Sequence, residues 1–311
     1  MRGPSFNPSK DIPSLAGKVI LVTGANTGIG KQTALDLSKH SPAQVWIAAR
    51  NTTTGNQAVS DIRAVASPQT TVKFLQMDLQ SLRSVKSAAR TVIQEANRLD
   101  ILILNAGIMG GEPGVTPDGY EKQFGTNHMG HALLFKLLVP LLDIAAKHRI
   151  GAEPRVLSLS SAGHDTSQLP SGGIALSTVK TAQPSLSGIT KYCQSKLANA
   201  VYPGAAAKRF PQFTIVAVNP GEVKTGLFST GSEGGGLIVR ILAVYIKWLG
   251  GGSVEDGAKN SLWCATQEGV QNGAFYYPVG LPGKESQLVK DGELGERLWK
   301  WTEQELKGHE L

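Results

Sequence analysis

A short apolar segment followed by a glycine-rich turn places the strongest constraint on the fold of this chain. Residues 18–23 read Lys-Val-Ile-Leu-Val-Thr, a nearly continuous apolar run that is typical of a strand buried on both faces of a parallel sheet. The turn at 24–30 has glycine at its first, fifth and seventh positions, and a helical pattern occupies 31–39. In such a strand–turn–helix unit, backbone N–H groups and the helix N-terminus can hold a pyrophosphate. The spacing Gly-x-x-x-Gly-x-Gly differs from the commoner Gly-x-Gly-x-x-Gly, but the context is the required one.

The rest of the chain repeats the alternation of strand and helix about every 25 residues. Further strands are expected at 44–49, 71–77, 99–104, 155–159, 214–218 and 273–279. The main helices between and after them are expected at 56–66, 81–98, 120–142, about 190–208, 256–266 and 294–306. This pattern predicts an α/β protein with a single Rossmann-type, doubly wound parallel sheet flanked by helices.

No internal repeat and no linker divides the chain, so residues 16–311 are expected to form one domain. The proline-rich residues 1–15 are expected to be a flexible or surface-lying lead-in. Pro203 and Gly204 interrupt the helical pattern toward residue 208, which predicts a kink or an early stop there.

Arg50 stands at the end of the second expected strand, twenty residues after Gly30. An Asp or Glu near this position would bind the ribose 2′-hydroxyl of NAD, whereas an arginine suits the 2′-phosphate of NADP. A single arginine at a strand end can also be a solvated surface charge. In the context of the glycine-rich turn we favour the phosphate interpretation, and NADP(H) over NAD(H).

Tyr192 and Lys196 are four residues apart and therefore share one helix face. A phenol with a pKa near ~10 is a weak acid at neutral pH, and a nearby ammonium group would lower that pKa. Such a pair can take part in proton transfer. Any helix can carry this spacing by chance, so its weight depends on the motifs around it.

Composition narrows the possible partners. The net charge of +7 comes from 31 Lys and Arg that are scattered along the chain, so we expect no nucleic-acid partner and attribute the charge to solubility and an anionic cofactor. No His, Cys and carboxylate cluster has metal-ligand spacing, so no metal is expected. The two cysteines predict no disulfide framework and fit a reducing compartment. No signal peptide is apparent, and no stretch reaches the ~20 consecutive apolar residues of a membrane span, which together indicate a cytoplasmic protein.

Taken together, six motifs resemble those of the short-chain dehydrogenase/reductase family over residues 16–285. They are the Thr23-Gly24-x-x-x-Gly28-Ile29-Gly30 turn, Asn105-Ala106-Gly107, Asn127, Ser160-Ser161, Tyr192-x-x-x-Lys196 and Pro220-Gly221. Several of them, among them Asn127-His128-Met129-Gly130-His131, look like the retinol-dehydrogenase-like branch. That branch holds many reductases of other substrates, so the likeness does not identify retinol as the substrate.

The resemblance implies a catalytic role for four residues. Tyr192 would be the general acid/base, and Lys196 would lower the pKa of Tyr192 and hold the nicotinamide ribose. Ser161 would hydrogen-bond the reacting oxygen, with Ser160 as a structural partner. Asn127 would complete a water-linked proton relay. Hydride delivery to a carbonyl builds negative charge on its oxygen, which donors of this kind stabilise. Alternatively, the serines could form only a strand-end turn and Asn127 could be a buried residue at a helix kink.

The resemblance also implies a set of cofactor contacts. Asp78 would bind the adenine amino group, Asn105 would line the adenosine side, and Val223 and Thr225 would touch the carboxamide; Asp78 could instead cap the next helix. The full expected set is Gly24, Asn26, Thr27, Gly28, Ile29, Gly30, Arg50, Asp78, Leu79, Asn105, Ala106, Gly107, Tyr192, Lys196, Pro220, Gly221, Val223 and Thr225. His128, His131 and His164 are interpreted as packing or surface residues.

These observations favour an NADP(H)-dependent oxidoreductase that transfers a hydride between the nicotinamide and a carbonyl or alcohol group. An apolar substrate is suggested by the segment 227–252, in which 237–249 is apolar except for Arg240 and Lys247. That segment could be a lid, a core helix, or an amphipathic helix in peripheral contact with a membrane. The alternative is a catalytically silent dinucleotide-binding regulatory or scaffold protein of the same fold. A monomer and a homodimer are both left open.

Overall fold

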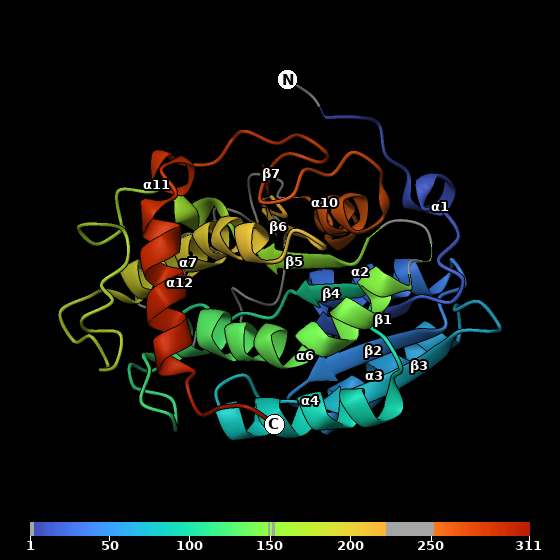
Figure 1. The fold of residues 1–311 in the computed structure, drawn as a ribbon, viewed down its shortest axis with the longest axis horizontal. Helices are drawn as coiled ribbons and strands as arrows, with labels where there is room; N and C mark the ends of the chain where they lie inside the picture. Colours follow the sequence, from blue (N-terminus) through green and yellow to red (C-terminus); the bar gives the residue numbers. More distant parts are fainter. Residues whose placement is uncertain (1–2, 149, 151–152, 222–251) are drawn as a thin grey trace.

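The computed structural model describes residues 3–148, 150, 153–221 and 252–311, and these form a seven-stranded parallel sheet covered by helices (Figure 1). The strand order is β3-β2-β1-β4-β5-β6-β7. The strands are β1 (Val19–Thr23), β2 (Gln44–Ala49), β3 (Thr71–Gln76), β4 (Ile101–Leu104), β5 (Arg155–Leu159), β6 (Thr214–Val218) and β7 (Phe275–Tyr276). The doubly wound α/β fold predicted from the alternation of elements is therefore confirmed.

The two faces of the sheet carry separate cores because side chains alternate along each strand. In β1, Val19 and Leu21 belong to one apolar cluster, whereas Ile20 and Val22 belong to the other. The first cluster is covered by α4 (Leu82–Glu95), α6 (Gly130–Lys147), α7 (Gly188–Arg209) and α12 (Glu293–Glu305). The second is covered by α2 (Gly28–Ser38), α3 (Thr52–Arg63) and α10 (Val254–Thr266). Burial on both faces explains why the strand sequences are almost wholly apolar.

The long helix expected at 120–142 is present as three consecutive elements that run from 122 to 147. They are α5 (Lys122–Phe124), a π-helical segment η1 (Gly125–Met129) and α6. Asn127 lies in the π turn, a feature that is frequent at functional sites. Close packing accounts for Gly130, since a Cβ there would lie 2.4 Å from the Leu79 carbonyl oxygen.

This same helix is long and apolar enough to cross a membrane, contrary to what the search for apolar runs predicted. However, 67% of its most apolar window is buried inside the protein, as in the core helix of a globular domain.

The helix that carries Tyr192 does not stop at Pro203, so the expected early stop is wrong. Helix α7 continues to Arg209 with Pro203 inside it. Ala205 and Ala206 beyond the proline are buried in the core that α7 shares with α12. Tertiary packing therefore outweighs the unfavourable propensity of proline in a helix interior. Figure 1 shows α12 crossing α7 on this side of the sheet.

Two further elements differ from the expectation. The lead-in contains a short helix, α1 (Pro8–Asp11), which Asn7 caps. Residues on both sides of this helix, namely Phe6, Ile12 and Leu15, are buried beside α2 and α10, so the lead-in packs on the domain. The last strand is shorter than the predicted 273–279, because after Tyr276 the chain turns back and the Tyr277 N–H donates to the Leu281 carbonyl oxygen at 2.9 Å.

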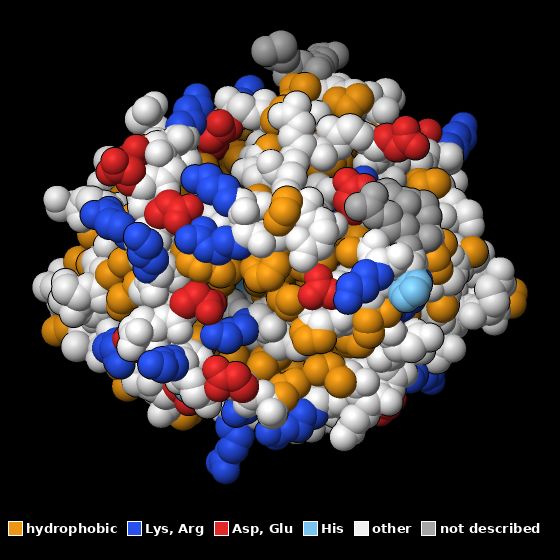
Figure 2. Space-filling model, in the orientation of Figure 1, with side chains coloured by type: hydrophobic (Ala, Val, Ile, Leu, Met, Phe, Trp, Pro, Cys, Tyr) orange, Lys and Arg blue, Asp and Glu red, His pale blue; other side chains and the backbone are white. Residues whose placement is uncertain are grey.

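On the face drawn in Figure 2, Lys and Arg side chains lie among Asp and Glu side chains. Ion pairs such as Lys136–Glu303 at 3.0 Å and Arg209–Glu296 at 2.8 Å connect α12 to α6 and α7. Each exposed pair of this kind contributes about 0–1 kcal/mol, so burial of the apolar face of α12 holds this helix in place.

Candidate active site

The predicted site residues meet at the carboxyl edge of the sheet. Each of the first six strands ends in one of the motifs named above: the glycine-rich turn, Arg50, Asp78-Leu79, Asn105-Ala106-Gly107, Ser160-Ser161 and Pro220-Gly221. The strand order reverses between β1 and β4, the point where ligands bind in doubly wound sheets. The fold thus brings together residues that are up to 197 positions apart, from Gly24 to Gly221.

The glycine-rich turn is shaped by the space that its glycines leave free. Gly24 and Gly28 have φ of +64° and +56°, which glycine adopts without strain. A Cβ at Gly30 would lie 2.3 Å from the Asn105 side-chain nitrogen. Thr27, the N-cap of α2, makes no side-chain capping bond. The first N–H groups of α2 are therefore not satisfied by their cap residue, the condition under which a helix N-terminus binds an anion.

Asn105 faces this turn, and its role in the structure is to fix the turn. Its side-chain Nδ2 donates to the carbonyl oxygen of Thr23 at 2.7 Å. Thr23 in turn accepts the backbone N–H groups of Asn105 and Ala106 at its Oγ1, both at 2.9 Å. Thr23, the last residue of β1, is a site residue whose contacts could not be predicted from the sequence. It connects the two turns that flank the switch point.

The next positions along the edge have distinct environments. Arg50 is exposed, and within the described part of the chain it has no ion-pair partner. Asn26 donates from Nδ2 to Thr54 Oγ1 at 2.9 Å. The Asp78 carboxylate accepts the Gln80 N–H at 3.0 Å, while Ser81 caps α4. The alternative role of Asp78 as a helix cap is therefore wrong.

Ser161 and Tyr192 lie close together, which brings β5 and α7 side by side: a Cβ at Gly163 would be 3.1 Å from Ser161 Oγ and 3.4 Å from Tyr192 Cε1. Ser161 Oγ also accepts the Gly163 N–H at 3.1 Å. Ser160 points elsewhere, since its hydroxyl donates to the Lys196 carbonyl oxygen at 2.8 Å and only 2% of its surface is exposed. Ser161 as the reacting serine, with Ser160 as its structural partner, stays a prediction.

Lys196 and Asn127 both lie next to Gly107. A Cβ at Gly107 would be 3.2 Å from Lys196 Nζ and 3.3 Å from Asn127 Oδ1. Lys196 Nζ donates to the Leu159 carbonyl oxygen at 3.0 Å. The Asn127 side chain accepts the Ile108 N–H at 2.8 Å and donates to Ser195 Oγ at 2.9 Å. The four predicted catalytic side chains thus lie in one region, where Asn127, Tyr192 and Lys196 are buried and Ser161 is half-buried.

Burial dominates the acid–base properties of the tyrosine and the lysine. Loss of solvation raises the pKa of Tyr192 to about 12, and the hydrogen bond with Ser161 opposes this rise. Loss of solvation also lowers the pKa of Lys196 to about 8. The Nζ atom lies 5.8 Å from the centre of the Tyr192 ring. The expected lowering of the phenol pKa is therefore wrong for this structure, because desolvation has the largest effect on this pKa.

The surroundings of the Tyr192 side chain are apolar. Met109, Tyr192 and Cys193 form a small buried cluster against which Leu169 and Ile189 pack. Loss of solvation raises the pKa of the Cys193 thiol, so this cysteine behaves as a packing residue. Met109, Leu169 and Ile189 carry no motif, and only their position beside the tyrosine distinguishes them.

The last predicted motif is described in part. Gly221 has a φ of +82°, and its N–H donates to Asn219 Oδ1 at 2.9 Å. Val223 and Thr225 lie outside the described residues, and so does almost all of the segment 227–252.

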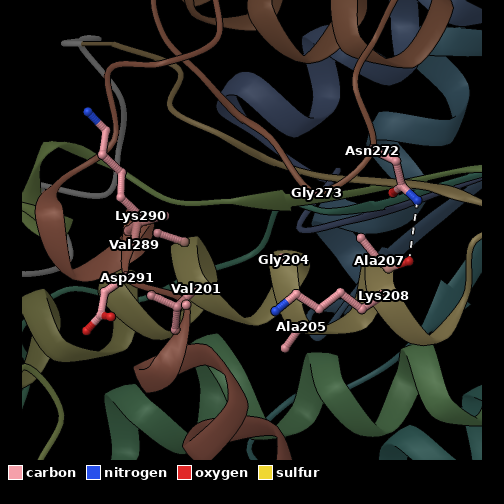
Figure 3. Close-up of a pocket in the computed structure, with 12 residues that line it drawn as sticks. Val201, Gly204, Ala205, Ala207, Lys208, Asn272, Gly273, Val289, Lys290 and Asp291 are labelled. Atoms are coloured by element: carbon pink, nitrogen blue, oxygen red, sulfur yellow. Dashed lines mark hydrogen bonds between the residues drawn. The ribbon is translucent and has the colours of Figure 1, made fainter.

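A shallow hollow of about 430 Å³ lies elsewhere, between the second half of α7 and the short helix α11 (Gln287–Lys290). Figure 3 shows Val201, Gly204 and Lys208 of α7 on one side of it and Val289 to Asp291 on another. Neither Tyr192 nor Lys196 lines this hollow, so it is separate from the candidate active site. In the described ranges, no three His, Cys, Asp or Glu side chains are grouped so that they could hold a metal ion.

Comparisons with known proteins identify the family. The family model for short chain dehydrogenases matches residues 18–166. Retinol dehydrogenase 12 from Homo sapiens is 34% identical over 92% of this chain and 85% of its own length. The chain belongs to the short-chain dehydrogenase/reductase family.

Other members of this family extend the likeness. The short-chain dehydrogenase/reductase drtF from Aspergillus calidoustus is 32% identical over 96% of this chain and 97% of its own length. A crystal structure of an uncharacterised protein from Mycobacterium paratuberculosis superposes with a TM-score of 0.71 at 29% identity, over 96% of this chain and 97% of that one. Both likenesses cover nearly the whole chain, so they include the described residues after 221.

Family membership has direct consequences for the chemistry. The chain is an oxidoreductase that uses a nicotinamide dinucleotide for hydride transfer. It is retinol-dehydrogenase-like in sequence. The silent scaffold, which was the alternative from the sequence, is not favoured by these relatives.

Proposed function

We propose that this protein is an NADP(H)-dependent carbonyl reductase or alcohol dehydrogenase that acts on an apolar substrate. The observation that carries the proposal is that Ser161 and Tyr192 lie together against Gly163, with Lys196 and Asn127 gathered beside Gly107. Two hydroxyl groups at one point can stabilise negative charge that develops on a carbonyl oxygen.

The chain offers a fitting cradle for the dinucleotide. Gly24, Gly30 and Gly107 stand where a Cβ would collide with neighbouring atoms, so these positions keep the edge of the sheet open. The N-terminus of α2 points its N–H groups at the turn without a capping side chain. Such a surface of backbone donors suits the pyrophosphate.

Arg50 supports a preference for NADP(H). Its guanidinium is exposed, lies at the end of β2, and has no ion-pair partner among the described residues. An arginine can bind the 2′-phosphate of NADP bidentately, whereas an acidic residue at this position would repel it.

In the proposed reduction, the cofactor supplies the hydride and this chain supplies the proton and the charge stabilisation. Tyr192 is protonated at neutral pH because its pKa is raised, so it can donate a proton to the carbonyl oxygen. Ser161 donates a hydrogen bond to the same oxygen, and the Lys196 ammonium stabilises the phenolate that remains. Asn127 is proposed to return the proton to Tyr192 through water and Lys196.

The apolar character of the substrate is inferred from the surroundings of Tyr192. A substrate carbonyl that reaches the Tyr192 hydroxyl would place its neighbouring carbons near Met109, Leu169 and Ile189. An apolar wall next to few polar groups is typical of a small-molecule site. Contact of this protein with a membrane and its monomeric or homodimeric state remain proposals from the sequence.

A titration of NADPH fluorescence tests the cofactor preference. NADPH and NADH are titrated into the wild type, Arg50→Ala, and the matched control Arg90→Ala, which removes another exposed arginine, on α4. We expect the Kd for NADPH to rise about 10-fold to 100-fold in Arg50→Ala only, since a hydrogen bond to a charged group contributes about 1.5–3 kcal/mol. Equal binding of NADH and NADPH, unaffected by Arg50→Ala, would contradict the preference. Turnover of apolar aldehydes and ketones by the wild type then tests the reaction.

A further inference from the structure

His131 on α6 joins the cofactor turn to the proposed proton-transfer site. Its Nε2 atom lies 2.8 Å from Thr23 Oγ1, and its Nδ1 atom lies 3.0 Å from the backbone oxygen of Asn127. Thr23 and Asn127 have no exposed surface, and only 3% of His131 is exposed. Loss of solvation lowers the pKa of His131 to about 4, so the ring is neutral at neutral pH.

The hydrogen bonds of Thr23 determine which ring nitrogen carries the proton. A hydroxyl group has two lone pairs and one proton. Both lone pairs of Thr23 Oγ1 are used by the N–H groups of Asn105 and Ala106, each at 2.9 Å. The hydroxyl therefore donates, and the nearest acceptor is His131 Nε2 at 2.8 Å, against 3.5 Å for the Ile103 carbonyl oxygen. The proton of the neutral ring is then on Nδ1.

This tautomer holds one particular peptide group. The Nδ1–H donates to the carbonyl oxygen of Asn127, which lies in the π turn where the regular helical pattern of hydrogen bonds is interrupted. With the other tautomer, the lone pair of Nδ1 would face the lone pairs of this oxygen. The Asn127 side chain lies beside Lys196 across Gly107, and the charge of Lys196 acts on His131.

We propose that His131 is a positioning residue for proton transfer: Thr23 fixes its Nδ1–H tautomer, and the ring then holds the Asn127 backbone in the π turn, which keeps the Asn127 side chain beside Lys196. The proposal rests on the proposed function, in which Asn127 and Lys196 return the proton to Tyr192. It adds a residue that binds neither cofactor nor substrate, and it makes the end of β1 part of the proton-transfer machinery.

Two substitutions separate the two hydrogen bonds of the ring. An asparagine side chain can place a donor near the position of Nδ1, whereas a glutamine side chain can place an acceptor near the position of Nε2. His131→Asn therefore keeps the bond to Asn127, and His131→Gln keeps the bond to Thr23. We expect kcat to fall at least about 10-fold in His131→Gln and less than about 3-fold in His131→Asn, since a misplacement of about 1 Å can reduce a rate about 100-fold. The KM for NADPH should change little in both.

His128 provides the matched control. It is equally buried on the same long helix, and its Nε2 atom pairs with Thr302 Oγ1 of α12 at 2.9 Å. His128→Asn and His128→Gln should both lower the melting temperature, but the two variants should have the same kcat. If His131 contributed to stability alone, His131→Asn and His131→Gln would also have equal kcat values, as expected for the two His128 variants.

A second measurement does not depend on turnover or on the folding of any variant. In ¹⁵N-histidine-labelled wild type, a long-range ¹H–¹⁵N spectrum distinguishes the two tautomers, and His131→Asn assigns the signal. A proton on Nδ1 at pH 7 supports the proposal, and a proton on Nε2 overturns it. With an active wild type, equal kcat values for His131→Asn and His131→Gln overturn the positioning role alone. A wild type without turnover of any carbonyl substrate defeats the proposed function, and the role in proton transfer falls with it.

Discussion

The two halves of the active site are built in opposite ways. Around the turns after β1 and β4, the decisive feature is the absence of side chains, since a Cβ at Gly24 or Gly30 would lie within 3 Å of neighbouring atoms. Around β5 and α7, the decisive feature is the presence of functional groups, namely the half-buried Ser161 and the buried Tyr192 and Lys196. In the proposed function, the first half would hold the dinucleotide with backbone groups, and the second half would act on the substrate with side chains.

This difference teaches what each half can tolerate. A backbone cradle is damaged by adding an atom, because nothing around it can move aside without disturbing the sheet. A proton-transfer site is damaged by removing an atom, because the reacting group itself is lost. The helix from 122 to 147 lies between the halves, and His131 and Asn127 on it make hydrogen bonds to both.

The largest effect is expected from removing one oxygen from the catalytic half. Tyr192→Phe should lower kcat about 100-fold to 10,000-fold, the usual contribution of general acid–base catalysis, and should leave the Kd for NADPH nearly unchanged. Steady-state kinetics and NADPH titration measure the two quantities. Tyr202→Phe is the matched control, because Tyr202 is also buried on α7 but its hydroxyl has no hydrogen-bond partner among the described residues. If the two variants had the same kcat, the assignment of Tyr192 would be wrong.

A smaller effect is expected from adding one carbon to the cofactor half. In Gly30→Ala the new Cβ would lie 2.3 Å from the Asn105 amide and 2.6 Å from the Gly24 carbonyl oxygen. We expect the Kd for NADPH to rise about 10-fold or more, with a loss of about 1–3 kcal/mol in the free energy of unfolding. Gly188→Ala is the control, because a Cβ at this first residue of α7 would meet nothing within 4 Å. Unchanged NADPH binding in Gly30→Ala would show that the turn can yield, and the contrast between the halves would then be lost.

The two halves also differ in how far the sequence alone could define them. The fold followed from the alternation of apolar strands with helices, and the order of the motifs placed the site at the carboxyl edge of the sheet. The roles of the glycine-rich turn and of Ser161 over Ser160 stay predictions, although the Ser160 hydroxyl is engaged by the Lys196 carbonyl oxygen.

Long-range contacts were not available from the sequence. Nothing in the local pattern shows that Thr23 meets His131, which is 108 residues away. Burial of Tyr192, which reverses the expected direction of its pKa shift, depends on packing from several elements. The same holds for α7, whose continuation past Pro203 depends on its packing against α12. Sequence patterns therefore located the groups, and only the tertiary structure defined their environments.

The smallest predicted effect concerns the helix that joins the halves, and it is measured as stability against pH. Burial lowers the pKa of His128 to about 3 and that of His131 to about 4, both below the ordinary value of 6.5. As the pH falls from 6.5 toward 4, the unfolded chain binds these protons before the folded chain does, so the free energy of unfolding decreases. Each histidine contributes a slope of about 1.4 kcal/mol per pH unit in this range. Urea unfolding at pH 7, 6 and 5 measures this free energy. It should decrease less steeply with falling pH in His128→Asn than in the wild type, by about the slope of one histidine. Parallel curves for the two proteins would mean that His128 takes up its proton in the folded state, and that the core between the halves is more accessible to water than its burial indicates.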